Sequence, residues 1–281
     1  WNNVTPVFAD IDPVTLCIDP NRIEDNVTDK TSAVLGVHVY GMPCNVSAIE
    51  SLAKAHSLKV IYDGAHAFGT EFDGKPIVQY GDATMLSFHA TKLFHSAEGG
   101  ALCVANADLK KQVDLLKNFG IKNEEEVLLP GINGKMNELQ AALGLLVLEH
   151  VDLEKQKRQA LRNIYESRMN KVPGVRILKA PSHASESQQY LIAIIDEARS
   201  GCSRDELHVR LKPFNIVTRK YFYPLCSNFD CYKHLPSAQP SRLPNAHRIA
   251  SQVLSLPLYG NLTADDVHRI CDTMVYCLQT A

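Results

Sequence analysis

Short apolar segments alternate with amphipathic segments along the first 150 residues of the chain. The apolar segments have the length of buried strands, and they lie at residues 34–39, 60–62, 84–88 and 101–104. Between them, residues 46–56 and 107–118 repeat apolar side chains at helical spacing, with Ile49, Leu52 and Ala53 on one face of the first. This alternation predicts an α/β fold in which helices cover a mostly parallel sheet.

The remainder of the chain predicts a smaller α+β domain. Residues 138–168 predict one long helix, whose apolar part, 139–146, should be buried and whose charged part, 154–162, should be exposed. Further strands are expected at 5–8, 190–195 and 217–222, and further helices at 204–211, 246–253 and 264–278. Because the long helix changes character midway, we expect a large domain over residues 1–155 and a small domain over residues 156–281.

Three polar residues stand directly before predicted helices. They are Asn45, Ser203 and Thr263. A side-chain oxygen at this position accepts a hydrogen bond from a backbone N–H group that the first helical turn leaves unpaired. We therefore expect helices to begin immediately after these residues, and we expect Pro213 to end the helix at 204–211.

Composition excludes several classes of function. Hydrophobic residues at 45% and charged residues at 21% are typical of a globular protein, and a formal net charge of −2 does not suggest a general nucleic-acid-binding surface. No apolar run approaches the roughly 20 residues of a membrane span. The 8 cysteines include no C-x-x-C pair. We expect Cys17, Cys44 and Cys103 to be free thiols, and we expect no metal site.

Two predicted strands lead to residues that could carry chemistry. One strand ends directly on Asp63, and the strand at 84–88 is followed by a loop that carries Lys92. Open α/β sheets place their ligands at the carboxyl ends of strands. An acid at one end and an amine at the next suit pyridoxal phosphate (PLP), which needs a Schiff-base lysine and an acid on its pyridine nitrogen. The alternatives are a surface lysine and a helix-capping aspartate.

Three longer segments carry a family resemblance. They are YDGAHAFG at residues 62–69, SFHATKLFHSAEGGA at residues 87–101 and GINGKMNELQAALGL at residues 131–145. In this order they resemble the signature segments of the DegT/DnrJ/EryC1/StrS family, which are PLP-dependent nucleotide-sugar aminotransferases of fold type I. The similarity runs over essentially the whole chain. It implies a large domain with a mostly parallel sheet sandwiched by helices, followed by a smaller α+β domain.

The same resemblance implies roles for the residues that would hold PLP. Lys92 would carry PLP as a Schiff base and move protons during the reaction, and Asp63 would pair with the pyridine nitrogen. His66 would contact the ring or its 3-hydroxyl group, although a structural histidine is the alternative. Ser87 would bind the phosphate. Asn133 would reach the cofactor phosphate of a partner subunit, which implies a homodimer with shared active sites.

Three further residues are implied on the substrate side: His89, Lys135 and Tyr221. His89 is expected to line the site. Lys135 stands where the family often has arginine, so a bidentate grip on phosphate would be lost. Tyr221 lies in RKYFYP at residues 219–224, which resembles a segment of family members that aminate the sugar at C4.

The reaction that the resemblance implies is a transamination. An amino group would pass from an amino acid, expected to be glutamate, to a keto group, expected at C4, of a nucleotide-linked deoxy sugar in the cytoplasm. Family members that catalyse sugar 3-dehydration carry histidine at the lysine position, so Lys92 argues against that route. A hydrolase that uses Ser87 would need a nucleophile elbow, and the sequence has none.

The start of the chain departs from the family pattern. The chain begins with Trp1 and leads directly into the strand expected at 5–8, whereas the resemblance places further βα segments before that strand. Those segments include the main loop that holds the cofactor phosphate at a helix N-terminus. We therefore expect a truncated sequence, and the alternative function is a truncated or non-catalytic relative that no longer binds PLP.

Overall fold

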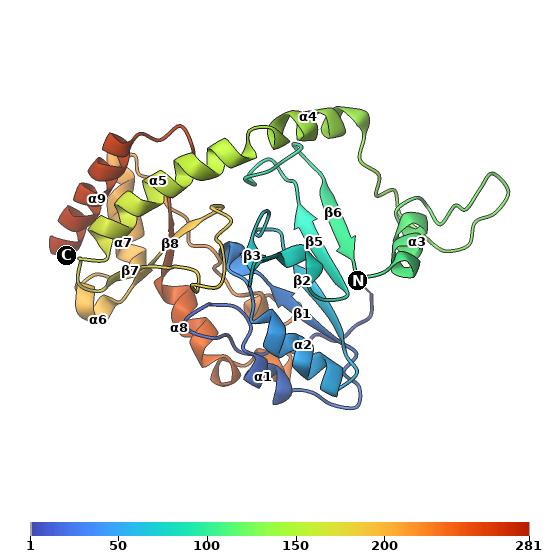
Figure 1. Ribbon diagram of the computed structural model, residues 1–281. Coiled ribbons are helices and arrows are strands. Elements are labelled where there is room, and N and C mark those ends of the chain that lie inside the picture. Colours follow the sequence, from blue (N-terminus) through green and yellow to red (C-terminus); the bar gives the residue numbers. More distant parts are fainter. Residues whose placement is uncertain (1, 281) are drawn as a thin grey trace.

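The fold is built on a four-stranded sheet in the first half of the chain (Figure 1). A computed structural model describes residues 2–280. The strands are β1 (Ala33–Val37), β2 (Lys59–Asp63), β5 (Ala83–Ser87) and β6 (Gly100–Val104), in the spatial order β1-β2-β5-β6. The first three strands are parallel and β6 runs antiparallel to β5. The predicted α/β fold with a mostly parallel sheet is therefore confirmed.

The two faces of this sheet have different surroundings. Val34, Val60 and Tyr62 point to one face and are buried with residues of α1 (Pro20–Glu24) and α2 (Val46–Ala55). Side chains of successive strand residues alternate between faces. The opposite face therefore carries the exposed apolar side chains Leu35, Val37, Ile61 and Leu102. Asp63 shares this opposite face because it pairs in register with Val37 and Met85.

A second sheet lies in the other half of the molecule. Its strands are β7 (Val175–Ile177), β8 (Leu191–Ile195) and β9 (Val253–Leu256), and they pair antiparallel in that order. The helices of this half are α6 (Glu197–Ser200), α7 (Arg204–Leu211), α8 (Pro244–Gln252) and α9 (Ala264–Gln279). Ser203 and Thr263 form capping boxes at the starts of α7 and α9, and Asn45 caps α2. All three predicted caps are confirmed.

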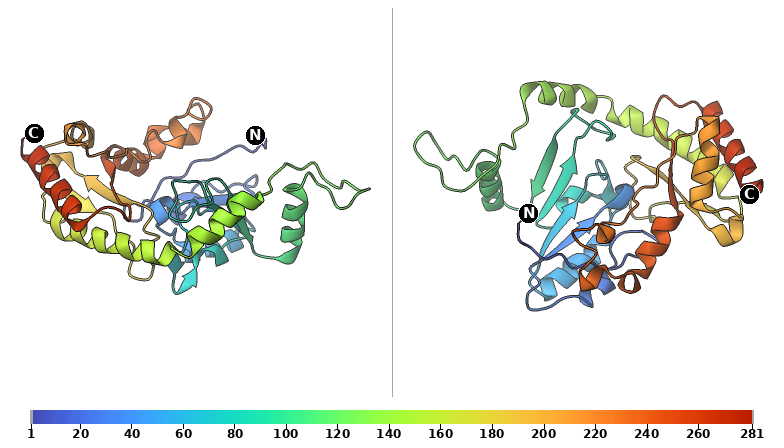
Figure 2. Two further views of the ribbon diagram at one scale, coloured as in Figure 1. Left: turned by 90° about the horizontal axis from the view of Figure 1, so that it is seen from above. Right: turned by 180° about the vertical axis from the view of Figure 1, so that it is seen from behind.

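The remaining elements connect these two parts. A short hairpin of β3 (Glu71–Phe72) and β4 (Lys75–Pro76) follows β2, and α3 (Ala107–Leu116) follows β6. Figure 2 shows the loop between α3 and α4 projecting away from the body of the molecule. Within residues 2–280, no helix combines the length and the apolar character that crossing a membrane would require.

The single long helix predicted at 138–168 is wrong, because two helices stand there. They are α4 (Glu138–Leu148) and α5 (Val151–Met169), and Figure 1 shows α5 continuing from the end of α4 toward the second sheet. The predicted burial of residues 139–146 is also wrong, since Leu139 is 84% exposed and Leu145 is 68% exposed. A helix that is apolar on all sides gives no sign of which side faces a neighbour, and Gly144 is the residue of α4 that is buried.

Three other expectations are corrected. Arg162, expected on an exposed surface, is only 4% exposed, because its guanidinium group is held by the Glu186 carboxylate and by carbonyl oxygens of residues 178 and 190. Residues 217–222 form no strand, and their one bridge pairs Arg219 with Ser255. The Phe222 ring at the end of this segment stacks on the rings of Tyr40 and His66 instead. Residues 5–8 also form no strand, in keeping with Pro6, which lacks the N–H group that a ladder needs.

The expected domain boundary between residues 155 and 156 lies inside α5 and stays a prediction. One apolar cluster includes Val34 and Ile49 beside the first sheet together with Ile192 and Val253 of the second sheet. A second cluster surrounds Tyr165 of α5 and packs α7 and α9 on the second sheet. The two sheets are thus joined by continuous apolar packing.

Burial of His38 should make the fold sensitive to acid. This side chain has no exposed surface, its ring stacks on Tyr62 with 4.6 Å between centroids, and its Nδ1 accepts a hydrogen bond from the Cys44 N–H at 3.0 Å. Among the described residues its Nε2 has no partner. Burial lowers the pKa of His38 from 6.5 to about 3. The unfolded chain therefore binds a proton between these values that the folded chain does not, and stability falls as the pH drops below 6.5.

The test compares the wild type with His38→Asn in urea unfolding. The variant should be the less stable protein at about pH 7.5, and its deficit should shrink by about 2 kcal/mol at about pH 5, because only the wild type loses stability through this histidine. A deficit that does not change with pH would contradict the prediction. Other histidines titrate equally in both proteins and cancel from the comparison.

Candidate functional site

The parallel pairing of β2 and β5 brings two strand ends together. β2 ends at Asp63 and β5 ends at Ser87. The chain after β2 stays beside β5, because the Gly64 N–H donates to the Met85 carbonyl at 2.7 Å. A Cβ atom on residue 64 would lie 2.9 Å from that carbonyl oxygen, so only glycine fits this close approach. The predicted position of Asp63 at a strand end is confirmed.

The Asp63 carboxylate is half-buried and has little internal compensation. Its Oδ1 accepts a hydrogen bond from the Ala65 N–H at 2.9 Å. No lysine, arginine or histidine among residues 2–280 forms an ion pair with it. A partly desolvated carboxylate is stabilised by a cationic or N–H partner. The carboxylate of Asp63 is therefore free to receive such a partner from a ligand.

Lys92 lies on a tight loop that follows β5. The loop closes at its base, where the Ser96 N–H donates to the Phe88 carbonyl at 3.0 Å, and it turns at Lys92, whose N–H donates to the His89 carbonyl at 2.9 Å. The next residues, Leu93 and Phe94, are buried in a cluster with Val151 of α5. Burial on one side thus anchors the loop and leaves Lys92 half-buried at the site.

Burial also makes the Lys92 amine less basic. Desolvation lowers the pKa of Lys92 below its ordinary value, and the negative charge of Asp63 raises it by a smaller amount. A lower pKa increases the fraction of neutral amine, which is the form that attacks carbonyl groups. Asp63 is thus close enough to Lys92 to change its pKa. Partial desolvation makes the Lys92 amine a better nucleophile than a fully exposed lysine.

His66 is held neutral between aromatic rings. Burial, together with the smaller effect of the positive charge of Lys92, lowers the pKa of His66 to about 3. Its Nδ1 accepts a hydrogen bond from the Tyr40 N–H at 3.3 Å, so in the neutral ring the proton belongs to Nε2. The ring stacks on Phe222 with 5.2 Å between centroids and meets the edge of Tyr190 at 5.0 Å.

Ser87 and His89 lie beside the lysine loop. The Ser87 Oγ accepts a long hydrogen bond from the His89 N–H at 3.4 Å. The exposed imidazole of His89 contacts the Thr91 hydroxyl at 2.9 Å, and its Nε2 lies 3.7 Å from a carboxylate oxygen of Glu98. These groups lie at the end of the same strand as Lys92, which agrees with their predicted position.

Asn133 and Lys135 are not brought to this site within the chain. They lie in the loop at residues 117–137, which projects away from the sheet in Figures 1 and 2. The Lys135 amine donates to the Asn133 Oδ1 at 2.7 Å and lies 4.2 Å from the ring centroid of Phe119. A contact between these residues and a cofactor would therefore involve a different copy of the site.

Tyr221, in contrast, lies near the site. Its ring stacks on Phe222 with 4.9 Å between centroids and meets the edge of Tyr190 at 5.7 Å. Its carbonyl oxygen accepts a hydrogen bond from the Tyr40 hydroxyl at 2.6 Å. Tyr40, Tyr190 and Phe222 are not among the residues predicted for the site, because aromatic residues beside strands are usually part of a core. The one available signal was the aromatic segment at 219–224.

The donor chemistry of these residues fits PLP. A partly desolvated amine at Lys92 suits an aldehyde, and the unpaired carboxylate of Asp63 suits a pyridine nitrogen. The neutral His66 presents an Nε2–H group that suits a phenolic oxygen, and the Ser87 hydroxyl suits a phosphate oxygen. The four groups come from the carboxyl ends of β2 and β5 and the loops that follow them.

Comparisons with known proteins agree with this geometry. The profile of the DegT/DnrJ/EryC1/StrS aminotransferase family matches residues 1–275. The chain is 42% identical to a dTDP-4-amino-4,6-dideoxy-D-glucose transaminase of Shigella dysenteriae, over 97% of this chain and 74% of that protein. It is 41% identical to a protein of the same name from Escherichia coli, over 96% of this chain and 73% of that protein.

Solved structures give the same result. The chain superposes with a TM-score of 0.93 on a crystal structure of DesI in the presence of its TDP-sugar product. The two chains are 38% identical, and the match covers 99% of this chain and 70% of that one. The fold type and the family resemblance predicted from the sequence are confirmed.

The charge of Asp63 should be measurable at Lys92 without any cofactor. Asp63→Asn removes the charge that raises the pKa of Lys92, so this pKa should fall further. The measurement is the pH dependence of Lys92 acetylation by trace acetic anhydride, read by peptide mass spectrometry, and the curve should move to lower pH. Asp82→Asn is the matched control, because Asp82 bonds Lys59 and the Val60 N–H instead. An unchanged curve for Asp63→Asn, or one moved to higher pH, would refute the coupling.

Proposed function

Since this chain belongs to the DegT/DnrJ/EryC1/StrS aminotransferase family, we propose that it transfers an amino group from an amino acid to a nucleotide-linked deoxy sugar with PLP as its cofactor. The acceptor is the keto group at C4, and glutamate is the donor. Two relatives named as transaminases of a dTDP-linked 4-amino-4,6-dideoxy sugar support the acceptor. The observation that carries the proposal is a desolvated Lys92 beside the unpaired carboxylate of Asp63.

Each residue of the site has a defined task in this proposal. PLP, when bound, supplies an electron sink for the carbon that loses a proton. The Lys92 Nζ would hold the cofactor aldehyde until the amino group of the donor displaces it. The freed Lys92 amine would then take the Cα proton of the donor and return a proton in the second half of the cycle. The Asp63 carboxylate would keep a proton on the pyridine nitrogen through its negative charge, and the His66 Nε2–H would donate to the phenolic oxygen of the ring.

The surroundings of these groups support proton transfer by Lys92. The low pKa of His66 keeps its imidazole neutral near neutral pH, so it adds no positive charge beside Lys92. The lowered pKa of Lys92 itself brings it nearer to the working pH, where an amine can both accept and release a proton. The aromatic side chains of Phe222 and Tyr190 limit water on one side of His66.

The active protein in this proposal is a cytoplasmic homodimer. The helix α4 and the projecting loop before it carry large apolar side chains that are exposed in a single chain, which are Val127, Leu128, Ile132, Leu139, Leu145 and Leu146. Exposed apolar patches of this extent are typical of interfaces between proteins. A two-fold partner seated on α4 would cover them, and the loop would bring Asn133 to the cofactor phosphate of that partner.

Covalent capture tests the role of Lys92 directly. Borohydride reduction of the PLP-loaded protein, followed by peptide mapping, should place the reduced pyridoxyl group on Lys92. Lys92→Ala should lower turnover by at least about 100-fold, because the proton-transfer group is lost. Lys75→Ala, at the exposed start of β4, should leave turnover unchanged. A label on another lysine, or normal turnover in Lys92→Ala, would refute the assignment. Absence of any PLP uptake would favour the non-catalytic alternative.

Hybrid dimers test the shared site. Asn133→Ala and Lys92→Ala should each be nearly inactive alone. Mixed in equal amounts and allowed to exchange subunits, they should recover about a quarter of wild-type activity, because half of the dimers would hold one intact site. Each intact site combines Lys92 of one subunit with Asn133 of the other. No recovery, or a monomer in sedimentation at the assay concentration, would remove the basis for the shared site.

A further inference from the structure

One buried side chain far along the sequence holds the backbone on both sides of Lys92. Gln189 precedes β8 and is 7% exposed. Its Oε1 accepts a hydrogen bond from the Leu93 N–H at 2.5 Å, and its Nε2 donates to the Thr91 carbonyl at 3.0 Å. One side-chain amide therefore pairs with the two peptide groups that flank Lys92.

This pairing supplies hydrogen bonds that the Lys92 loop does not form within itself. Between Phe88 and Ser96 the loop has its own closing bond and the turn at Lys92, but the Thr91 carbonyl and the Leu93 N–H are paired only through Gln189 among the described hydrogen bonds. Breaking these bonds would leave a carbonyl and an N–H group partly buried without partners, which is unfavourable. The amide thus acts as a clamp on the dipeptide that carries Lys92.

Gln189 is itself held from the other side. Its N–H donates to the Ser187 Oγ at 3.2 Å, and Ser187 packs against Gly41 so closely that a Cβ on residue 41 would lie 2.0 Å from that oxygen. Gly41 has a φ of +85°, which glycine adopts without strain. The segment that carries Gln189 is therefore seated tightly on the loop that follows β1.

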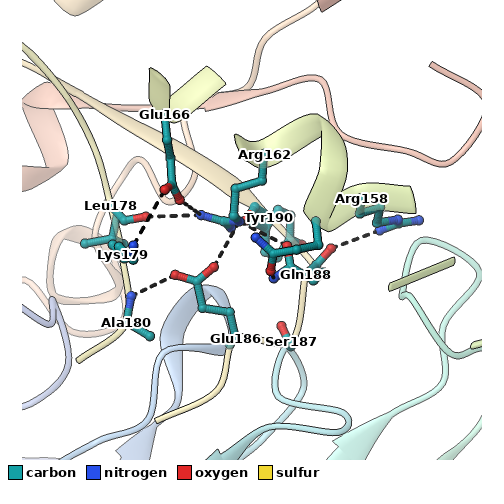
Figure 3. A network of polar contacts seen from close by, with 12 residues as sticks. Arg158, Arg162, Glu166, Leu178, Lys179, Ala180, Glu186, Ser187, Gln188 and Tyr190 are labelled. Carbon is teal, nitrogen blue, oxygen red and sulfur yellow. Dashed lines mark hydrogen bonds and ion pairs between the residues drawn. The ribbon is translucent and has the colours of Figure 1, made fainter. Parts of the chain in front are cut away.

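Arg162 of α5 completes the anchorage, as Figure 3 shows. Its guanidinium group donates to the Gln188 Oε1 at 3.0 Å and to the Tyr190 carbonyl at 2.6 Å, on either side of Gln189. It also pairs with Glu186 at 2.9 Å. A planar guanidinium group with several donors holds its partners in fixed positions. The residues before and after Gln189 are thus bound to a rigid helix, and Gln189 passes this rigidity to the loop.

We infer that Gln189 is a positioning residue for the reaction at Lys92. It touches no reacting atom. It fixes the backbone from Thr91 to Leu93 and keeps the Lys92 amine in its partly desolvated place. This inference rests on the proposed function of Lys92, but the clamp itself exists whether or not PLP binds. Its effect can therefore be measured in the cofactor-free protein as well as in the loaded one.

The chain offers a matched control beside it. Gln188 is a buried glutamine of the same segment, but its amide bonds Arg162 and Gln159 and does not touch the Lys92 loop. Gln189→Met and Gln188→Met each replace a buried amide by an apolar chain of similar length. Gln188→Met removes one bond from Arg162 but leaves the bond from Arg162 to the Tyr190 carbonyl and both bonds of Gln189 to the loop. Its effect on the Lys92 loop should therefore be much smaller than that of Gln189→Met.

The first readout is hydrogen exchange in the cofactor-free protein. In Gln189→Met the Leu93 amide should exchange at least about tenfold faster, because the loss of one such hydrogen bond is worth roughly that factor. Gln188→Met should leave this amide close to wild type. Gln189→Glu retains an acceptor for the Leu93 N–H but loses the donor to Thr91, so its exchange rate should lie between those of the wild type and Gln189→Met.

The second readout is the acetylation curve of Lys92. A loosened loop exposes the amine to water, so the pKa of Lys92 should rise in Gln189→Met and the curve should move to higher pH. When PLP is added, Gln189→Met should also form the Schiff base at Lys92 more slowly than Gln188→Met, as measured by visible absorption.

The outcomes separate the two proposals. The clamp would be overturned if Gln189→Met and the wild type had equal exchange rates at the Leu93 amide and equal acetylation curves at Lys92. It would also be overturned if Gln189→Met and Gln188→Met changed these quantities equally, since this would show a general loosening of the structure. If Gln189→Met fails to fold, the same comparisons hold for Gln189→Glu. PLP that remains covalently bound in Lys92→Ala would overturn the proposed function but would leave the exchange result for the clamp standing.

Discussion

The site depends on the parallel pairing of β2 with β5. This pairing puts Asp63 and Ser87 at one edge of the sheet, and it requires Gly64 where the chain leaves β2 against the Met85 carbonyl. Parallel strands are joined by long connections, so residues far apart in sequence reach the same edge. The other parts of the site, from the lysine loop to the aromatic rings around His66, are arranged around this edge of the sheet.

Desolvation is the second physical factor that organises the site. Burial lowers the pKa of both Lys92 and His66, while the nearby carboxylate of Asp63 raises the pKa of Lys92 by a smaller amount. A neutral imidazole and a weakly basic amine can lie side by side without repulsion, whereas two cations could not. The surrounding rings of Tyr190 and Phe222 therefore influence the chemistry through the solvent that they exclude.

Rigid anchorage of the lysine loop comes from the second half of the chain. Arg162 is buried with the carboxylate of Glu186 and with carbonyl oxygens on the segment that carries Gln189. A buried cation is tolerated only where such partners surround it, so this cluster holds α5 and the segment before β8 in one arrangement. The apolar packing between the two sheets and this polar cluster together make the site a product of both halves.

The sequence alone determined the local features of this protein. Strand ends, the caps at Asn45, Ser203 and Thr263, and the placement of Asp63 and Lys92 follow from short-range rules of backbone hydrogen bonding and side-chain alternation. Tertiary structure decided which side chains are buried and which distant segments are in contact, and short-range rules do not determine either. The tertiary structure leaves leucines of α4 exposed and buries Arg162, although Arg162 lies in a charged helix. It also forms aromatic packing instead of the strand expected at 217–222, and it places Gln189 beside the Lys92 loop. The reason is physical: burial and hydrogen-bond partners depend on which distant segments meet, and a one-dimensional pattern of apolar and polar residues does not specify those meetings.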